Sequence, residues 1–149
     1  MRVPAADAPT ERPYRLPVRI YFEHTDALGI AYHSNYLNFF ERARSEIIGL
    51  GELVRLREQQ LGFVVYDASM RFKLPAKLGD DLEIRSLVRP MSAVRLRCWQ
   101  DAYKTSDAGT PIEPQLLVAA VIDLAFIDVR GTPARLPEEL TARFRDAAG

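Results

Sequence analysis

The sequence predicts an α+β domain in which an antiparallel sheet wraps around one long, buried helix. Three observations support this fold class. Residues 15–23 alternate between apolar and polar side chains, as a half-buried strand does. Residues 35–50 instead place apolar side chains at helical spacing, and segments rich in strand-forming residues follow them. One strand, one long helix and a succession of four strands therefore favour a sheet packed against a helix.

The first strand and the helix differ in their apolar periods. One face of the strand carries Leu16, Val18, Ile20 and Phe22. The apolar residues of the helix recur every three or four positions, at Tyr36, Phe39, Phe40, Ala43, Ile47 and Leu50. We expect Ser34 or Asn35 to cap the first turn by accepting a backbone N–H. Gly49 or Gly51 is expected to end the helix, and a short second helix to follow over residues 52–60.

The four later strands are expected at residues 63–74, 82–88, 94–103 and 116–129. Turn-forming segments separate them, namely LPAKLGDD, RPMS and KTSDAGTPIEP. The last of these segments is expected to be a long loop. A short helix is expected over PEELTARFRDA, with Pro137 in its first position and acidic residues in its first turn.

Composition narrows the class of protein. The chain has 149 residues, 48% of them hydrophobic and 27% charged, which suits one globular domain. We expect that domain at residues 14–149, after a flexible lead-in at residues 1–13. Twenty Lys and Arg residues balance twenty Asp and Glu residues, which argues against nucleic acid as a partner. The single cysteine and the lack of a signal-like or membrane-spanning apolar run predict a cytoplasmic protein with no integral membrane segment.

The stretch HTDALGIAYHSNY, residues 24–36, holds the candidate chemistry. Asp26 follows the first strand and precedes a helix N-terminus, where free backbone N–H groups and the positive end of the helix dipole meet. Those N–H groups can polarise a carbonyl, while Asp26 attacks it or activates a water molecule. This arrangement suits acyl transfer. An Asx-type turn is the alternative role for Asp26, and a surface or capping role is the alternative for His33.

A metal site is a second interpretation of this stretch. His24, Asp26 and His33 have the composition of a two-histidine, one-carboxylate triad. No cysteine lies nearby and no other ligand spacing supports a metal, so we predict neither metal nor cofactor. Cys98 shares a strand face with apolar neighbours, which predicts a buried structural thiol. The sequence has no G-x-S-x-G elbow and no glycine-rich dinucleotide loop, which disfavours serine hydrolases and nucleotide enzymes.

Residues 15–48, RLPVRIYFEHTDALGIAYHSNYLNFFERARSEII, resemble the signature of the hotdog-fold acyl-CoA thioesterases of the 4-hydroxybenzoyl-CoA thioesterase-like family, especially its YbgC branch. That branch has a strand, then T-D-A-x-G-x-x-Y-H-x-x-Y, then a helix with F-x-E-R-A-R. The later segments FVVYDASMRFKLPAKLGDDLEI and RLPEEL also look like the family's second strand, turn and tail. The resemblance implies a five-stranded antiparallel sheet around a long helix, in a homodimer or homotetramer with active sites between protomers.

The resemblance also implies roles for residues of this stretch. Asp26 would act as nucleophile or general base on the thioester carbonyl. The backbone near Tyr32 and His33 would polarise that carbonyl, and the histidine is associated with activity in the YbgC branch. Gly29 would let the chain turn closely past the substrate. The implied reaction is hydrolysis of a small or medium acyl-CoA, aliphatic or aromatic, to the free acid and coenzyme A.

Four further residues are candidates for substrate binding. Tyr36 can line the acyl pocket, and Arg71, Lys73 and Lys77 lie beside the predicted pocket strand, where they can bind the phosphates of coenzyme A. A solvated strand face is the alternative for the three cations. Two other functions stay open, namely a hotdog-type enoyl-CoA hydratase and a non-catalytic acyl-CoA-binding module.

The sequence departs from the family pattern at three positions. His24 stands where a carboxylate is usual, Leu28 where a glycine is common, and Phe22 where a second tyrosine often follows Tyr21. These departures weaken any essential role for position 24 and predict a changed loop or pocket shape near Leu28.

Overall fold

The computed structural model describes residues 12–146, so residues 1–11 of the predicted lead-in lie outside the described part. The elements in chain order are β1 (Tyr14–Arg19), the short 3-10 helix η2 (Phe22–His24), α1 (Asn35–Ile48), α2 (Leu50–Glu58), β2 (Leu61–Phe72), β3 (Asp81–Pro90), β4 (Arg95–Asp107), β5 (Thr110–Asp128) and α3 (Glu138–Asp146). None of the helices within this range is long and apolar enough to cross a membrane.

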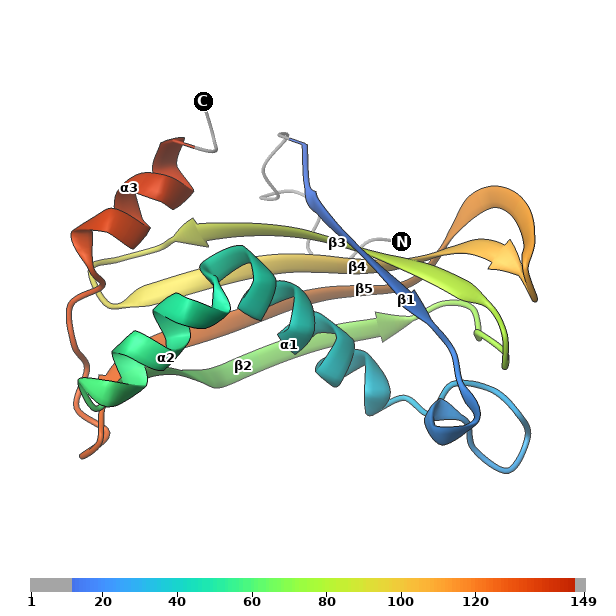
Figure 1. Cartoon of the computed structure of the whole chain (residues 1–149), viewed down its shortest axis with the longest axis horizontal. Helices are drawn as coiled ribbons and strands as arrows, with labels where there is room; N and C mark the ends of the chain where they lie inside the picture. The colour runs from blue at the N-terminus through green and yellow to red at the C-terminus, as the bar shows by residue number, and fades with distance from the viewer. Residues whose placement is uncertain (1–11, 147–149) are drawn as a thin grey trace.

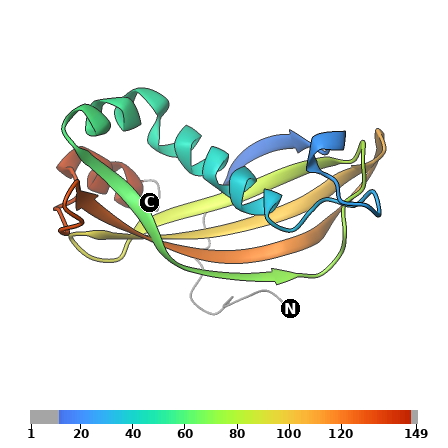
Figure 2. The ribbon, with the colours of Figure 1, turned by 90° about the horizontal axis from the view of Figure 1, so that it is seen from below.

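The five strands form one antiparallel sheet in the order β1-β3-β4-β5-β2. Helices α1 and α2 lie along one face of this curved sheet (Figures 1 and 2). Phe39, Phe40 and Ala43 of α1 are fully buried, and apolar residues of β3, β4 and β5 complete the core beneath them. The α+β fold predicted from the sequence is therefore confirmed.

The start of α1 differs from the expected capping. Ser34 holds the cap position, but its side chain makes no cap hydrogen bond. The Asn35 side chain does not accept from the first turn either, because its Nδ2 donates to the backbone oxygen of His24 at 2.8 Å. At the other end Gly49, with φ of 100°, terminates α1 as predicted.

The first strand is shorter than predicted, since β1 ends at Arg19 and η2 follows. His24 causes this change of direction, because its Nδ1 accepts the Tyr21 N–H at 2.9 Å and its own N–H donates to the Tyr21 oxygen at 2.9 Å. Phe22, which was expected on the buried face of the strand, is 81% exposed.

The expected long loop at residues 104–114 is a β-hairpin instead. Strand β4 continues to Asp107, β5 begins at Thr110, and Ala108 and Gly109 alone connect them. Both connecting residues have positive φ, 47° and 95°, as a two-residue turn of the I′ kind requires. A polar segment can pair as strands when a buried acceptor fixes its turn, and here the Ala108 N–H donates to Asp80 Oδ1 at 2.9 Å.

A buried polar cluster joins α1 to the sheet. The Arg44 guanidinium donates to Gln100 Oε1 at 2.8 Å, and Gln100 Nε2 donates to the Phe40 oxygen at 3.0 Å and to Ser86 Oγ at 2.9 Å. Because buried polar groups demand partners, this cluster fixes the position of α1 over β3 and β4.

Cys98 is fully buried as predicted, and burial raises the pKa of its thiol to about 12.

Candidate active site

Asp26 lies in a tight turn between η2 and α1. Its N–H donates to the Ile30 oxygen at 2.9 Å, and its Oδ1 accepts the Leu28 N–H at 2.8 Å. Gly29 completes the turn with φ of 77°, a conformation that favours glycine. The Asx-type turn considered from the sequence therefore exists, but it occupies Oδ1. Oδ2 has no hydrogen-bond donor among residues 12–146, so one carboxylate oxygen is left for chemistry.

The turn is anchored to the segment that precedes β3. Ile30 and Lys77 form an antiparallel bridge, and the Ala31 N–H donates to the Ala76 oxygen at 2.8 Å. A third contact runs from the Leu78 N–H to the Gly29 oxygen at 3.3 Å. The position of Asp26 thus depends on residues 76–78, far along the chain.

The N-terminus of α1 supplies the second half of the site. A preceding turn uses the oxygens of Tyr32, His33 and Ser34 as acceptors for the first N–H groups of the helix. The N–H groups of His33 and Ser34 themselves have no acceptor in the described part of the chain. Free N–H groups at the positive end of a helix attract a negatively charged oxygen. They are the available donors for a polarised carbonyl.

A pocket of about 370 Å³ joins these features. Its lining consists of Asp26, Ile30, Ala31, Tyr32, His33, Tyr36, Phe72, Lys73, Leu74 and Pro75. The pocket therefore brings together Asp26, Tyr32, His33, Tyr36 and Lys73 of the residues named from the sequence.

Three of the residues predicted for catalysis or substrate binding lie outside that lining. Gly29 shapes the turn behind Asp26. Arg71 is exposed on β2 opposite Ala119, and because strand side chains alternate it points away from its neighbour Phe72, which lines the pocket. Lys77 bridges Ile30 through its backbone, while its Nζ lies 3.7 Å from Asp107 Oδ1.

Phe72 is a pocket residue that the sequence did not single out. Its ring contacts His33 edge-on at 6.3 Å and Tyr36 at 6.0 Å between centroids, and the Tyr32 and His33 rings lie 4.4 Å apart. The signal that could have found it is its place at the end of a strand, next to the turn LPAKLGDD.

Burial, together with the charge of Asp80, raises the pKa of Tyr36 to about 12, so this phenol keeps its proton and can donate a hydrogen bond.

His24 does not join the pocket. Its ring is buried, packs edge-on against Phe39 at 5.2 Å and accepts the Tyr21 N–H. Within residues 12–146 no group of three or more His, Cys, Asp or Glu side chains is placed to hold a metal ion. The geometry thus gives His24 a structural role in η2 rather than that of a ligand.

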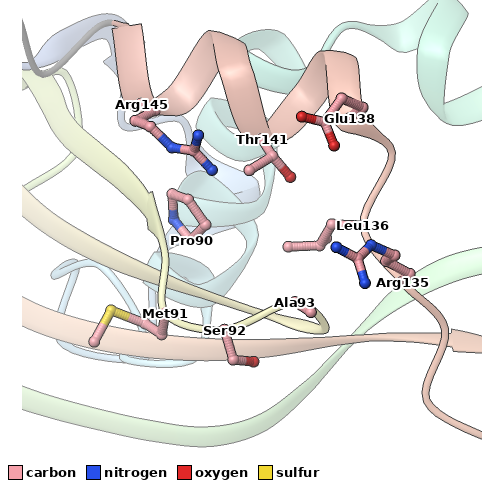
Figure 3. A pocket seen from close by; sticks show the side chains of 9 residues that line it. All are labelled: Pro90, Met91, Ser92, Ala93, Arg135, Leu136, Glu138, Thr141 and Arg145. Carbon is pink, nitrogen blue, oxygen red and sulfur yellow. The ribbon is translucent and has the colours of Figure 1, made fainter.

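A second cavity, of about 420 Å³, lies at the opposite end of the sheet (Figure 3). The β3–β4 turn and α3 with its preceding residues supply its lining, which mixes Arg135, Arg145 and Glu138 with uncharged side chains. Although this cavity is larger, its lining contains none of the residues predicted from the sequence for catalysis or substrate binding. Size alone does not make it the better candidate, because the carboxylate and free helix N–H groups are at the other end.

The sequence matches the family model of the thioesterase-like superfamily over residues 20–144. The chain belongs to this superfamily. It is 33% identical to the acyl-CoA thioesterase YbgC of Haemophilus influenzae over 135 residues, which cover 88% of this chain and 93% of that protein. It is 32% identical to the acyl-CoA thioester hydrolase YbgC of Escherichia coli over 134 residues, or 89% and 96% of the two chains.

The fold of this thioesterase is shared with solved structures. Slr0204, a 1,4-dihydroxy-2-naphthoyl-CoA thioesterase from Synechocystis, superposes with a TM-score of 0.77 at 23% identity, over 89% of this chain and 96% of that one. The resemblance to the YbgC branch, the hotdog fold and the enzyme class, all expected from the sequence, are confirmed. The roles of individual site residues stay predictions.

Proposed function

We propose that the protein hydrolyses the thioester bond of an acyl-CoA, with Asp26 as the reacting carboxylate. The observation that carries this proposal is that the two oxygens of the Asp26 carboxylate have different roles. Oδ1 holds the turn through the Leu28 N–H, while Oδ2 is free beside the pocket that the start of α1 also lines. The names of the YbgC relatives support the acyl-CoA substrate.

Two routes lead from this geometry to the same products. As a general base, Asp26 takes a proton from water while the water oxygen attacks the carbonyl carbon. As a nucleophile, Asp26 forms an anhydride with the acyl group, which water then cleaves. In both routes the C–S bond breaks, the sulfur leaves as the thiol of coenzyme A after gaining a proton, and the acid is released. The free N–H groups near His33 stabilise the negative charge that develops on the carbonyl oxygen.

The pocket lining favours a small or medium acyl group. Tyr36, Phe72, Leu74 and Pro75 present apolar surface in a volume of about 370 Å³. Lys73 at the pocket is the first candidate for binding a coenzyme A phosphate. Arg71 and Lys77, which lie outside the lining, are candidates for the more distant phosphates of the nucleotide. Aromatic and aliphatic acyl groups both fit this description.

We further propose that the protein is a homodimer, or a homotetramer built from such dimers, in the cytoplasm. Strand β2 is an edge of the sheet and exposes Val64, Val65 and Tyr66 by 42–51%. Phe72 and Leu74, at the pocket beside this edge, are also about half exposed, at 50% and 48%. Unpaired apolar edge strands invite pairing with another chain. Pairing along β2 would cover these side chains and enclose the pocket between protomers.

The decisive experiment measures thiol release from a panel of aliphatic and aromatic acyl-CoAs. Asp26→Asn keeps an Oδ1 acceptor for Leu28, so the turn survives while the base is lost, and kcat should fall by ~10²- to 10⁴-fold. His33→Ala tests whether the imidazole beside Phe72 contributes to thiol release. Glu58→Gln, which neutralises an exposed carboxylate on α2, is the matched control and should keep wild-type kcat.

The same assay has outcomes that contradict the proposal. Full activity in Asp26→Asn would remove the carboxylate mechanism. Loss of activity with a chelator would favour a metal. Hydration of an enoyl-CoA without thiol release would favour the hydratase, and binding without turnover of any substrate would favour the binding module.

A further inference from the structure

Asp80 is a fully buried carboxylate with partners in the segment before β3 and in the β4–β5 hairpin. Its Oδ1 accepts the Ala108 N–H at 2.9 Å, from the turn of the β4–β5 hairpin. Its Oδ2 accepts the Lys77 N–H at 2.8 Å and lies 3.2 Å from Lys104 Nζ. A buried carboxylate with three donors is fully satisfied, whereas loss of its charge would leave those donors unpaired.

The segment that Asp80 holds is the one that anchors the catalytic turn. Residues 76–78 contact residues 29–31 through the bridge and the two hydrogen bonds described above. Asp80 also forms a turn with this segment, because its backbone N–H donates to the Lys77 oxygen at 3.0 Å. In Figure 1 the loop before α1, the segment before β3 and the tip of the β4–β5 hairpin all lie at the same end of the sheet.

The backbone of Ile20, the residue after β1, joins this arrangement. The Asp80 oxygen accepts the Ile20 N–H at 2.9 Å, and the Gly79 N–H donates to the Ile20 oxygen at 2.8 Å. Ile20 lies just ahead of η2, which leads into Asp26. Residues 76–78 contact the Asp26 turn itself, Ile20 lies in the chain before it, and Asp80 contacts both of these segments.

We propose that Asp80, with Lys104 as its counter-ion, is a positioning residue that fixes the turn of Asp26 against the N-terminus of α1. Asp80 does not line the pocket, so it acts through residues 76–78 and not on the substrate. This inference rests on the proposed role of Asp26. It also explains why the polar segment 104–114 pairs as a hairpin: the hairpin delivers the Ala108 N–H and the Lys104 side chain to Asp80.

The charges near the pocket also support the role of Asp80 as a positioning residue. Burial lowers the pKa of Lys104, but its hydrogen bonds to Asp107 and Asp80 outweigh burial, so the lysine stays charged beside Asp80. The Asp80 charge also reaches the pocket, where it adds to burial in raising the pKa of Tyr36. An asparagine at position 80 would keep one acceptor oxygen, but it would lose the second acceptor and this charge.

The test compares Asp80→Asn with Asp81→Asn. The neighbouring Asp81 is a matched control, because it pairs with Arg19 and Ser106 and has no contact with residues 76–78 among the described residues. In Asp80→Asn we expect kcat to fall ~10- to 100-fold through misplacement of Asp26, with KM changed less than about twofold. Hydrogen exchange of the Ala31 and Leu78 amides should accelerate in Asp80→Asn and stay unchanged in Asp81→Asn.

Lys104→Met is the second variant, because it keeps the carboxylate and both backbone donors. It should show the same changes to a smaller degree, and it decides the question if Asp80→Asn does not fold. Wild-type kcat and wild-type amide exchange in a folded variant would overturn the proposal.

A double variant separates this proposal from the proposed function. If Asp80 acts through Asp26, Asp80→Asn should cost nothing further in the Asp26→Asn background; a further tenfold loss there would overturn the inference. If Asp26→Asn alone keeps full activity, the proposed function fails, and the exchange of Ala31 and Leu78 still decides whether Asp80 fixes the turn.

Discussion

Asn35, the first residue of α1, donates its side-chain amide to the backbone oxygen of His24, just before the Asp26 turn, at 2.8 Å. The same oxygen accepts the Tyr32 N–H at 2.8 Å. One carbonyl therefore closes the whole loop from His24 to Asn35. The helix N-terminus and Asp26 are held at a fixed separation by this closure, which is what a carboxylate and an oxyanion donor on opposite sides of one carbonyl need.

Asn35→Ala should loosen that loop. We expect a loss of about 1 kcal/mol in the free energy of unfolding, the usual contribution of one such hydrogen bond. The kcat for thiol release should fall about tenfold, because the donors and Asp26 are no longer held together. Urea unfolding and steady-state kinetics measure the two effects. Asn38→Ala, an exposed position on the same helix, should change neither.

Gly29→Ala should strain the Asp26 turn although space is available for the added methyl group. No atom lies within 4 Å of an added Cβ, but φ of 77° disfavours any side chain. We expect the melting temperature to fall by about 3 °C, corresponding to about 1 kcal/mol. Gly62→Ala is the matched control, because its added Cβ is equally unobstructed and its φ is not positive. An equal loss in both variants would refute the assignment of strain to Gly29.

The Arg44–Gln100 pair should show strong coupling. Gln100→Leu leaves a buried guanidinium N–H without its acceptor, at a cost of about 2–3 kcal/mol in the free energy of unfolding. The double variant Arg44→Met, Gln100→Leu removes both partners and should lose less than the sum of the single losses. Urea denaturation of the four proteins measures the coupling. Gln115→Leu, at an exposed position on β5, should stay within about 0.5 kcal/mol of wild type.

Cys98 should make the protein less stable in alkali. Burial raises the pKa of the folded thiol from 9.0 to about 12, so above about pH 9 the unfolded chain releases a proton that the folded chain keeps. The stability from this thiol is present in full below pH 9 and falls as pH rises, by up to ~1.4 kcal/mol per pH unit. Urea unfolding between pH 8 and about pH 10 should show a steeper decline for wild type than for Cys98→Ala. Parallel curves would contradict the assignment.

Periodicity in the sequence was enough to predict the sheet, the long helix and most strand positions. It failed where a single long-range hydrogen bond decides local structure. Nothing near Ala108 reveals that Asp80 accepts its N–H, so the hairpin looked like a loop. Similarly, the alternation that places Phe22 on a buried face takes no account of the His24 imidazole that turns the chain.

The candidate site was predictable to a comparable extent. The motif around Asp26 and His33 is contiguous in sequence, and the structure brings those residues to one pocket. Phe72 and Asp80 come from segments far along the chain, and only the folded sheet brings them near. Local spacing carries no information about such partners.

The order of strands in the sheet has a consequence for folding. The β4–β5 hairpin pairs neighbours across a two-residue turn, so it can close early at little entropic cost, whereas β1 with β3 and β2 with β5 must close long loops. The Asp26 turn and α1 leave the ribosome before any strand that they pack on except β1. Phe72 ends β2, whose partner in the sheet is β5, the last strand to be synthesised. We therefore expect the nascent chain to lack the complete candidate site until β5 is synthesised.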